Sequence, residues 1–103
     1  MKNRIYFKHH DAIKSLIRSL GTYETDDFLQ SELSNFTKDV VSARERIYRI
    51  KESMNFQNNS DEKKHLQYEL DEAINSLSAF LDKLKIADEM YICYKEYLKK
   101  HYA

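Results

Sequence analysis

The most regular feature of the sequence is a four-three spacing of apolar residues, repeated over two long runs. A helix that keeps one side against a partner helix needs this spacing. Neither run alternates with a period of two, as a half-buried strand would, so both predict long helices. We call these positions the seam. The upstream seam is Leu29, Leu33, Phe36, Val40, Ala43, Ile47, Ile50 and Met54. The downstream seam is Leu66, Leu70, Ala73, Leu77, Phe80, Leu84, Ala87, Tyr91, Tyr94 and Leu98.

Three helices follow from the seam and from the residues that interrupt it. The chain has no proline and a single glycine, Gly21, which predicts the end of a first helix. Thr25 is a suitable N-cap for the second helix, and Ser60 is a suitable N-cap for the third. The expected helices cover residues 4–20, 26–56 and 61–101.

The short polar interval at 57–60 predicts that the two long helices form an antiparallel hairpin. The first helix then folds back over the open end, where a second apolar stripe offers it a surface. The expected fold is all-α: an elongated antiparallel coiled-coil hairpin of two long helices plus a shorter N-terminal helix, together a three-helix bundle. The chain has 103 residues, a length that predicts one helical domain, 1–103. The second stripe is Ile86, Met90, Cys93 and Tyr97.

The turn end of the expected hairpin holds only two helices, and it leaves apolar residues beside the seam. Two-helix hairpins bury too little apolar surface to be stable by themselves. Dimerisation into a four-helix section is the simplest remedy, so we expect a homodimer. The residues left beside the seam are Val41, Tyr48, Ile74 and Leu81.

The charge balance and the single cysteine indicate which compartment suits the protein and which partners its overall charge would attract. The 17 basic and 17 acidic side chains give a net charge of zero, so there is no global attraction to nucleic acid or to an anionic membrane. Cys93 is the only cysteine, which excludes an intrachain disulfide and suits a reducing compartment. The N-terminal residues form no uninterrupted apolar stretch of the secretory type, and no segment approaches a membrane span. A cytoplasmic location without membrane contact is the expectation.

The leading functional prediction is a non-catalytic module that binds another protein through a helical surface. An adaptor, a chaperone-like protein and an inhibitor or immunity-type protein all fit this description. Tyrosine is abundant at protein interfaces, and it gathers at the C-terminal end of this chain. The candidate protein-binding residues are Tyr94, Tyr97, Lys99 and Tyr102 at that end, with Ile47, Tyr48 and Ile50 in the second helix.

Nucleic-acid binding is the alternative prediction. The outer face of the first helix gathers basic side chains with an aromatic residue at its edge, which could contact phosphates and stack on bases. A solvated face paired with acidic neighbours explains the same pattern without a ligand. The residues concerned are Arg4, Phe7, Lys8, Lys14 and Arg18.

The sequence offers no catalytic or metal-binding constellation, and no cofactor is expected. No pattern singles out a histidine and a carboxylate that would activate the Cys93 thiol. Glu62 and His65 have the Glu-x-x-His spacing of di-iron bundles, but a second copy of the motif is missing. We therefore expect that the protein is not an enzyme.

Residues 44–75 resemble the small helical-hairpin aspartyl-phosphate phosphatases that act on sporulation response regulators. That family carries a Ser-Gln-Glu-Leu-Asp motif early in its second helix. This chain has Gln67-Tyr68-Glu69-Leu70-Asp71, which matches the final Glu-Leu-Asp and departs at the first two positions. The resemblance implies a phosphatase-like regulator as a lesser alternative.

Overall fold

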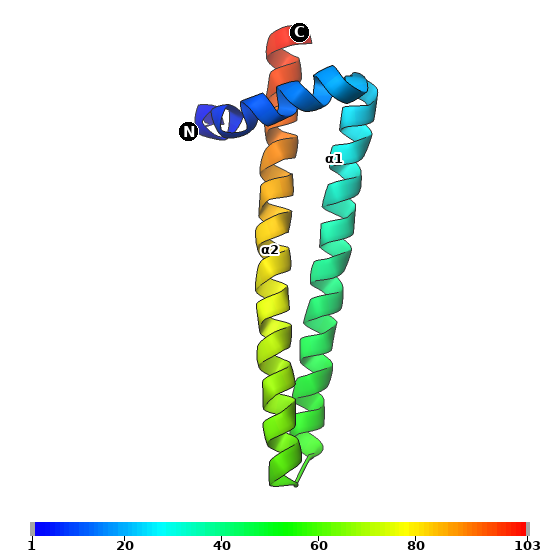
Figure 1. Cartoon of the computed structure of the whole chain (residues 1–103), viewed down its shortest axis with the longest axis vertical. Coiled ribbons are helices and arrows are strands. Elements are labelled where there is room, and N and C mark those ends of the chain that lie inside the picture. Colours follow the sequence, from blue (N-terminus) through cyan, green and yellow to red (C-terminus); the bar gives the residue numbers. More distant parts are fainter. Residues whose placement is uncertain (1, 103) are drawn as a thin grey trace. The chain divides into compact units, whose positions relative to one another are not determined.

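The computed structural model describes residues 2–102 and the side chains of residues 8–101. The chain forms two long helices, α1 (Lys2–Phe56) and α2 (Ser60–Tyr102), which pack against each other (Figure 1). The all-α class and the pair of long helices predicted from the seam are confirmed. Within the described range, neither helix has the long, weakly charged apolar stretch that crossing a bilayer requires.

The turn between α1 and α2 is closed by Asn59. Its side-chain oxygen accepts hydrogen bonds from the backbone N–H groups of Asp61 at 2.8 Å and Glu62 at 3.1 Å. Asn59 is therefore the N-cap of α2, and the expected cap Ser60 is already the first residue of the helix. The helix begins one residue earlier than predicted because an Asn side chain satisfies the same orphan N–H groups.

Two helical segments of α1 meet at a kink at Gly21, so the helix breaks at the residue where the sequence predicted it. The backbone angles of Gly21, φ 84° and ψ 167°, are not helical and kink the helix, and it is the one residue with positive φ in the described chain. Helical structure resumes immediately after it, so the loop expected over residues 21–25 is absent. The N-cap expected at Thr25 is absent for the same reason. Thr25 lies inside the helix, fully buried, and its hydroxyl has no hydrogen-bond partner.

The chain divides into two compact units. Unit 1 comprises the chain up to Asn35 and from Lys83 onward, and unit 2 comprises Phe36–Asp82. The core of unit 1 brings Ile13, from before the kink, together with Leu29, Cys93 and Tyr94. In Figure 1 the helix segment before Gly21 crosses the C-terminal part of α2 rather than running alongside it. The structure thus does not show the expected three-helix bundle.

The core of unit 2 lies along the seam between α1 and α2. Its buried members are Ile50, Leu70 and Ala73, and further seam residues pack against them. Among the described side chains, every buried apolar residue other than Ile13 and Cys93 belongs to the seam. The four-three spacing therefore predicted correctly which residues would be buried between the long helices. The partly buried members of this core are Ile47, Met54 and Leu66.

Candidate interaction surface

The predicted contact residue Tyr94 is part of the core of unit 1. Its side chain is only 3% exposed, and its hydroxyl donates a hydrogen bond to the backbone oxygen of Thr22 at 3.1 Å. The ring of Tyr91 is stacked beside it with centroids 6.0 Å apart, and the Tyr91 hydroxyl lies 3.4 Å from a carboxylate oxygen of Asp26. Tyr94 is therefore a core residue rather than the exposed contact expected from the sequence.

The other predicted residues of the C-terminal end are divided between packing and solvent. The Tyr97 ring packs between two histidines, 4.1 Å from the ring of His101 and 5.7 Å from that of His10 between centroids. Lys99 is exposed, with its amine 3.7 Å from the carboxylate of Glu96 on the next turn of the helix. The side chain of Tyr102 lies outside the described residues. The contacts of Tyr97 and Lys99 are all within the chain, and they do not indicate a binding site for a partner at the C-terminal end.

The basic face predicted near the N-terminus is partly neutralised by Glu89 on α2. The Lys8 amine donates a hydrogen bond to Glu89 Oε1 at 3.0 Å, and His9 Nε2 lies 3.1 Å from the same oxygen. Lys14 and Arg18 are exposed, whereas the side chains of Arg4 and Phe7 lie outside the described residues. Nucleic-acid binding therefore stays a prediction, and the Lys8 charge does not contribute fully to it.

Glu89 makes unit 1 sensitive to acid. Hydrogen bonds from His9 and Lys8 hold the pKa of its carboxyl below the ordinary value, so the ionised form is stabilised by folding. A group with a lowered folded-state pKa stabilises the protein above its unfolded pKa, and that contribution is lost as pH falls through the folded pKa. Glu89→Gln should therefore lower the melting temperature at about pH 7, and the difference from the wild type should shrink as the pH falls below the ordinary pKa of a glutamate.

The measurement is thermal unfolding followed by circular dichroism across this pH range. Glu45→Gln is the control, because it removes an exposed carboxylate that pairs with Arg49 at 3.8 Å within one helix. A melting-temperature difference for Glu89→Gln that stays constant down to about pH 3 would contradict the assignment of this carboxylate.

Cys93 is enclosed in the core of unit 1. Its side chain is fully buried, and this burial raises the pKa of the thiol, opposed by a hydrogen bond with the backbone of His9. A buried thiol with a raised pKa is a weak nucleophile. Among the side chains of residues 8–101, no group of three His, Cys, Asp or Glu residues is placed to hold a metal ion.

The three predicted contact residues of unit 2 differ in how far their side chains are exposed. Ile50 is 7% exposed, and Ile47 packs against the same cluster, so both belong to the seam core rather than to a surface. Tyr48 is 64% exposed and points away from the core. Of these three residues, only Tyr48 offers a side chain to a partner.

Tyr48 belongs to a patch of exposed apolar residues that we call the apolar flank. Each member directly follows a seam residue in the sequence. In an antiparallel pair, positions that directly follow seam residues turn toward the same face, because each residue advances the helix by 100° in the same sense. The flank therefore combines two residues from each helix. They are Val41 (50% exposed), Tyr48 (64%), Ile74 (46%) and Leu81 (47%).

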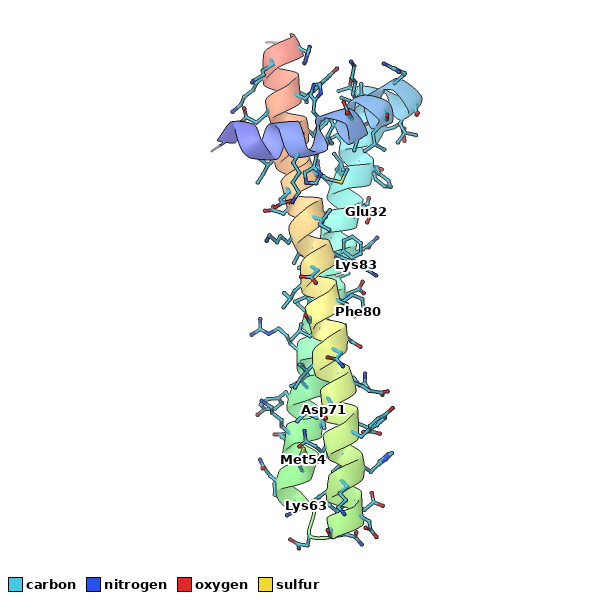
Figure 2. The ribbon with its side chains drawn as sticks, turned by 60° about the vertical axis from the view of Figure 1, so that its left-hand side comes forward. Glu32, Met54, Lys63, Asp71, Phe80 and Lys83 are labelled. Carbon is cyan, nitrogen blue, oxygen red and sulfur yellow. The ribbon has the colours of Figure 1, made fainter. Side chains whose placement is uncertain are left out.

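Charged residues lie within and beside the apolar flank. Arg44 and Lys51 follow seam residues of α1, and Asp71 follows a seam residue of α2, so all three lie on this face. All three are exposed, and one oxygen of Asp71 accepts a hydrogen bond from Gln67 at 3.0 Å. Asp71 is labelled in Figure 2 on α2. On α1, Arg44 and Lys51 lie between the seam and the line of Val41 and Tyr48, and on α2, Asp71 lies beyond the line of Ile74 and Leu81.

The opposite face of unit 2 carries different side chains beside the seam. The positions that directly precede seam residues turn to this second face, and they are small or charged rather than large and apolar. They line shallow hollows above the seam. The large apolar side chains beside the seam thus lie on the first face, and on the second face the exposed apolar residue is Phe56 at the end of α1. The residues lining the second face include Asp39, Ser42, Arg46, Arg49, Ser53, Glu69 and Ser76.

Comparison with protein-family models, with curated proteins and with solved structures finds no match to this chain. The phosphatase resemblance of residues 44–75 gains no support from these comparisons.

Proposed function

We propose that the protein is a non-catalytic interaction module that binds a protein partner through the apolar flank of unit 2. The observation that supports this proposal is the gathering of four large apolar side chains, each about half exposed or more, on one face of a two-helix unit. Contiguous apolar patches rimmed by charged residues are typical of interaction sites, whereas isolated exposed apolar residues are ordinary.

The flank has the geometry of a helix-binding surface. Val41 and Tyr48 are seven residues apart, as are Ile74 and Leu81, so each pair lies on one line along its helix. A partner helix with apolar side chains at the same spacing can contact both lines, and it then also meets Arg44 and Lys51, which lie between them. These charged residues would select the orientation of the partner.

Site-specific photo-crosslinking tests the proposal. The photoreactive residue p-benzoylphenylalanine replaces Tyr48 in one variant and Tyr68 in another. These two tyrosines are matched, since both are in unit 2 and their exposed fractions are 64% and 63%. Tyr68 lies on the outer side of α2, away from its seam. In cells that produce the chain, irradiation should yield a protein adduct at position 48 and little or none at position 68.

Adding Leu81→Lys to the position-48 variant should abolish the adduct, because a charge placed in the flank must be desolvated for a partner to bind. Equal adducts at positions 48 and 68, or an adduct that persists with Leu81→Lys, would contradict the flank as the binding surface. Mass spectrometry of the adduct tells whether the bound protein is a second copy of the chain or a different protein.

A further inference from the structure

We infer that the partner seated on the apolar flank is a second copy of this chain, related by a two-fold axis parallel to the helices. In this arrangement α1 of each copy lies against α2 of the other, and unit 2 becomes one half of a four-helix section. The inference rests on the proposed function and adds the identity and orientation of the partner.

The short turn between Phe56 and Ser60 determines which residues of α1 and α2 lie at about the same level along the hairpin. Because the helices are antiparallel, the numbers rise along one and fall along the other. Figure 2 shows Met54 near the turn end of α1. Counting from the turn along each helix places Tyr48 close to the level of Ile74 and Val41 close to the level of Leu81. Counted from the turn in opposite directions, the core residues of the two helices pair as Met54 with Leu66, Ile50 with Leu70 and Ile47 with Ala73.

A two-fold axis parallel to the helices keeps these levels and exchanges α1 for α2. It therefore places Tyr48 against Ile74 of the second copy and Val41 against Leu81 of the second copy. Each apolar residue of the flank then contacts an apolar residue of the second copy. The two-fold symmetry makes each of these contacts occur twice in the dimer. Such self-complementarity is what an isologous dimer interface requires.

The charges on the flank favour this orientation over the other two-fold arrangement. Lys51 of α1 lies close to the level of Asp71 of α2, so the parallel axis places each Lys51 beside an Asp71 of the other copy. An axis perpendicular to the helices would instead set α1 against α1. The centre of the flank, between Val41 and Tyr48, would then bring Arg44 against Arg44 of the second copy. Like charges at the centre of an interface are unfavourable, which selects the parallel axis.

Sedimentation equilibrium of the full chain tests the identity of the partner. We expect a mass of twice 12.4 kDa at micromolar concentrations. Tyr48→Glu should weaken the dimer by roughly thirtyfold, because it places a charge at the centre of an apolar contact. Tyr68→Glu is the matched control with nearly the same exposure, and it should leave the dimer unchanged. Circular dichroism of each variant verifies that the helices are intact.

Mixing two charge variants tests the orientation. Lys51→Glu alone brings two acidic side chains together at both of the contacts between positions 51 and 71, and Asp71→Lys alone brings two basic ones together. Each variant should therefore dimerise about tenfold more weakly than the wild type. In a mixture of the two, both contacts between copies pair opposite charges, whereas within each copy the two residues still carry like charges. Native mass spectrometry should show a heterodimer that is favoured over both homodimers.

Three results would overturn the inference. The first is a monomeric wild-type chain at micromolar concentrations. The second is a dimer that Tyr48→Glu does not weaken, since that dimer would use another face. The third is a mixture in which the heterodimer is not favoured, which excludes the parallel axis. A monomeric chain that still gives a position-48 adduct with a different protein would refute the second copy and leave the proposed function standing.

Discussion

Replacing Ile13 by alanine should lower the free energy of unfolding by about 3 kcal/mol. Ile13 lies before the kink of α1, its side chain is fully buried, and it is the largest of the fully buried residues. Its removal leaves a cavity against Leu29, Cys93 and Tyr94 in the core of unit 1. The measurement is urea unfolding of the full chain, followed by circular dichroism.

Ile92→Ala is the matched control for this substitution. Ile92 neighbours Cys93 in the sequence, yet its side chain is 40% exposed, so its truncation should cost less than about 1 kcal/mol. Similar losses for the two isoleucines would show that the segment before the kink does not pack into the core of unit 1. The comparison thus tests the packing of the segment before Gly21 into that core, to which Leu16 and Ile17 also contribute.

Replacing Gly21 by L-alanine should destabilise the chain by about 2 kcal/mol, although the same exchange inside a regular helix is stabilising. The backbone of Gly21, at φ 84° and ψ 167°, lies in a region that is almost exclusive to glycine. A Cβ atom built at this position meets no atom within 4 Å, so the loss comes from backbone conformation rather than from a clash. Urea unfolding measures it.

D-alanine at position 21, introduced by chemical ligation, separates the two explanations. A D-residue adopts positive φ without strain and carries the same methyl group, so the D-alanine protein should be about as stable as the wild type. Equal losses with L- and D-alanine would mean that the added methyl group is harmful in itself. A gain in stability with L-alanine would mean that α1 is not kinked at Gly21.

The burial of the seam residues was predictable because it depends on local geometry. Positions seven residues apart lie on the same side of a helix, as in the series that contain Leu70 and Ala73. This holds whatever the rest of the chain does. The end of the turn was less predictable. Both Asn59 and Ser60 can cap a helix, and their difference in energy is a fraction of the total stability, so sequence could not choose between them.

The candidate contact residues were less well predicted, for a different reason. Tyr94 and Ile50 looked suitable for an interface, but an apolar seam residue is suitable for an internal interface as well as for an external one. The signal for the apolar flank was nevertheless present in the sequence. The residues that directly follow four seam positions are large and apolar, whereas those that directly precede the seam are mostly small or charged.

The sequence by itself determined that the chain is helical, which side of each long helix is apolar, and where the chain can turn. These properties arise from the 3.6-residue period and from single residues such as Gly21. The tertiary structure alone decided that Tyr94 is enclosed while Tyr48 is exposed, that Glu89 pairs with Lys8, and that the segment before the kink crosses α2. The physical reason is that burial depends on which surfaces meet, and surfaces far apart in the sequence meet only once the chain has folded.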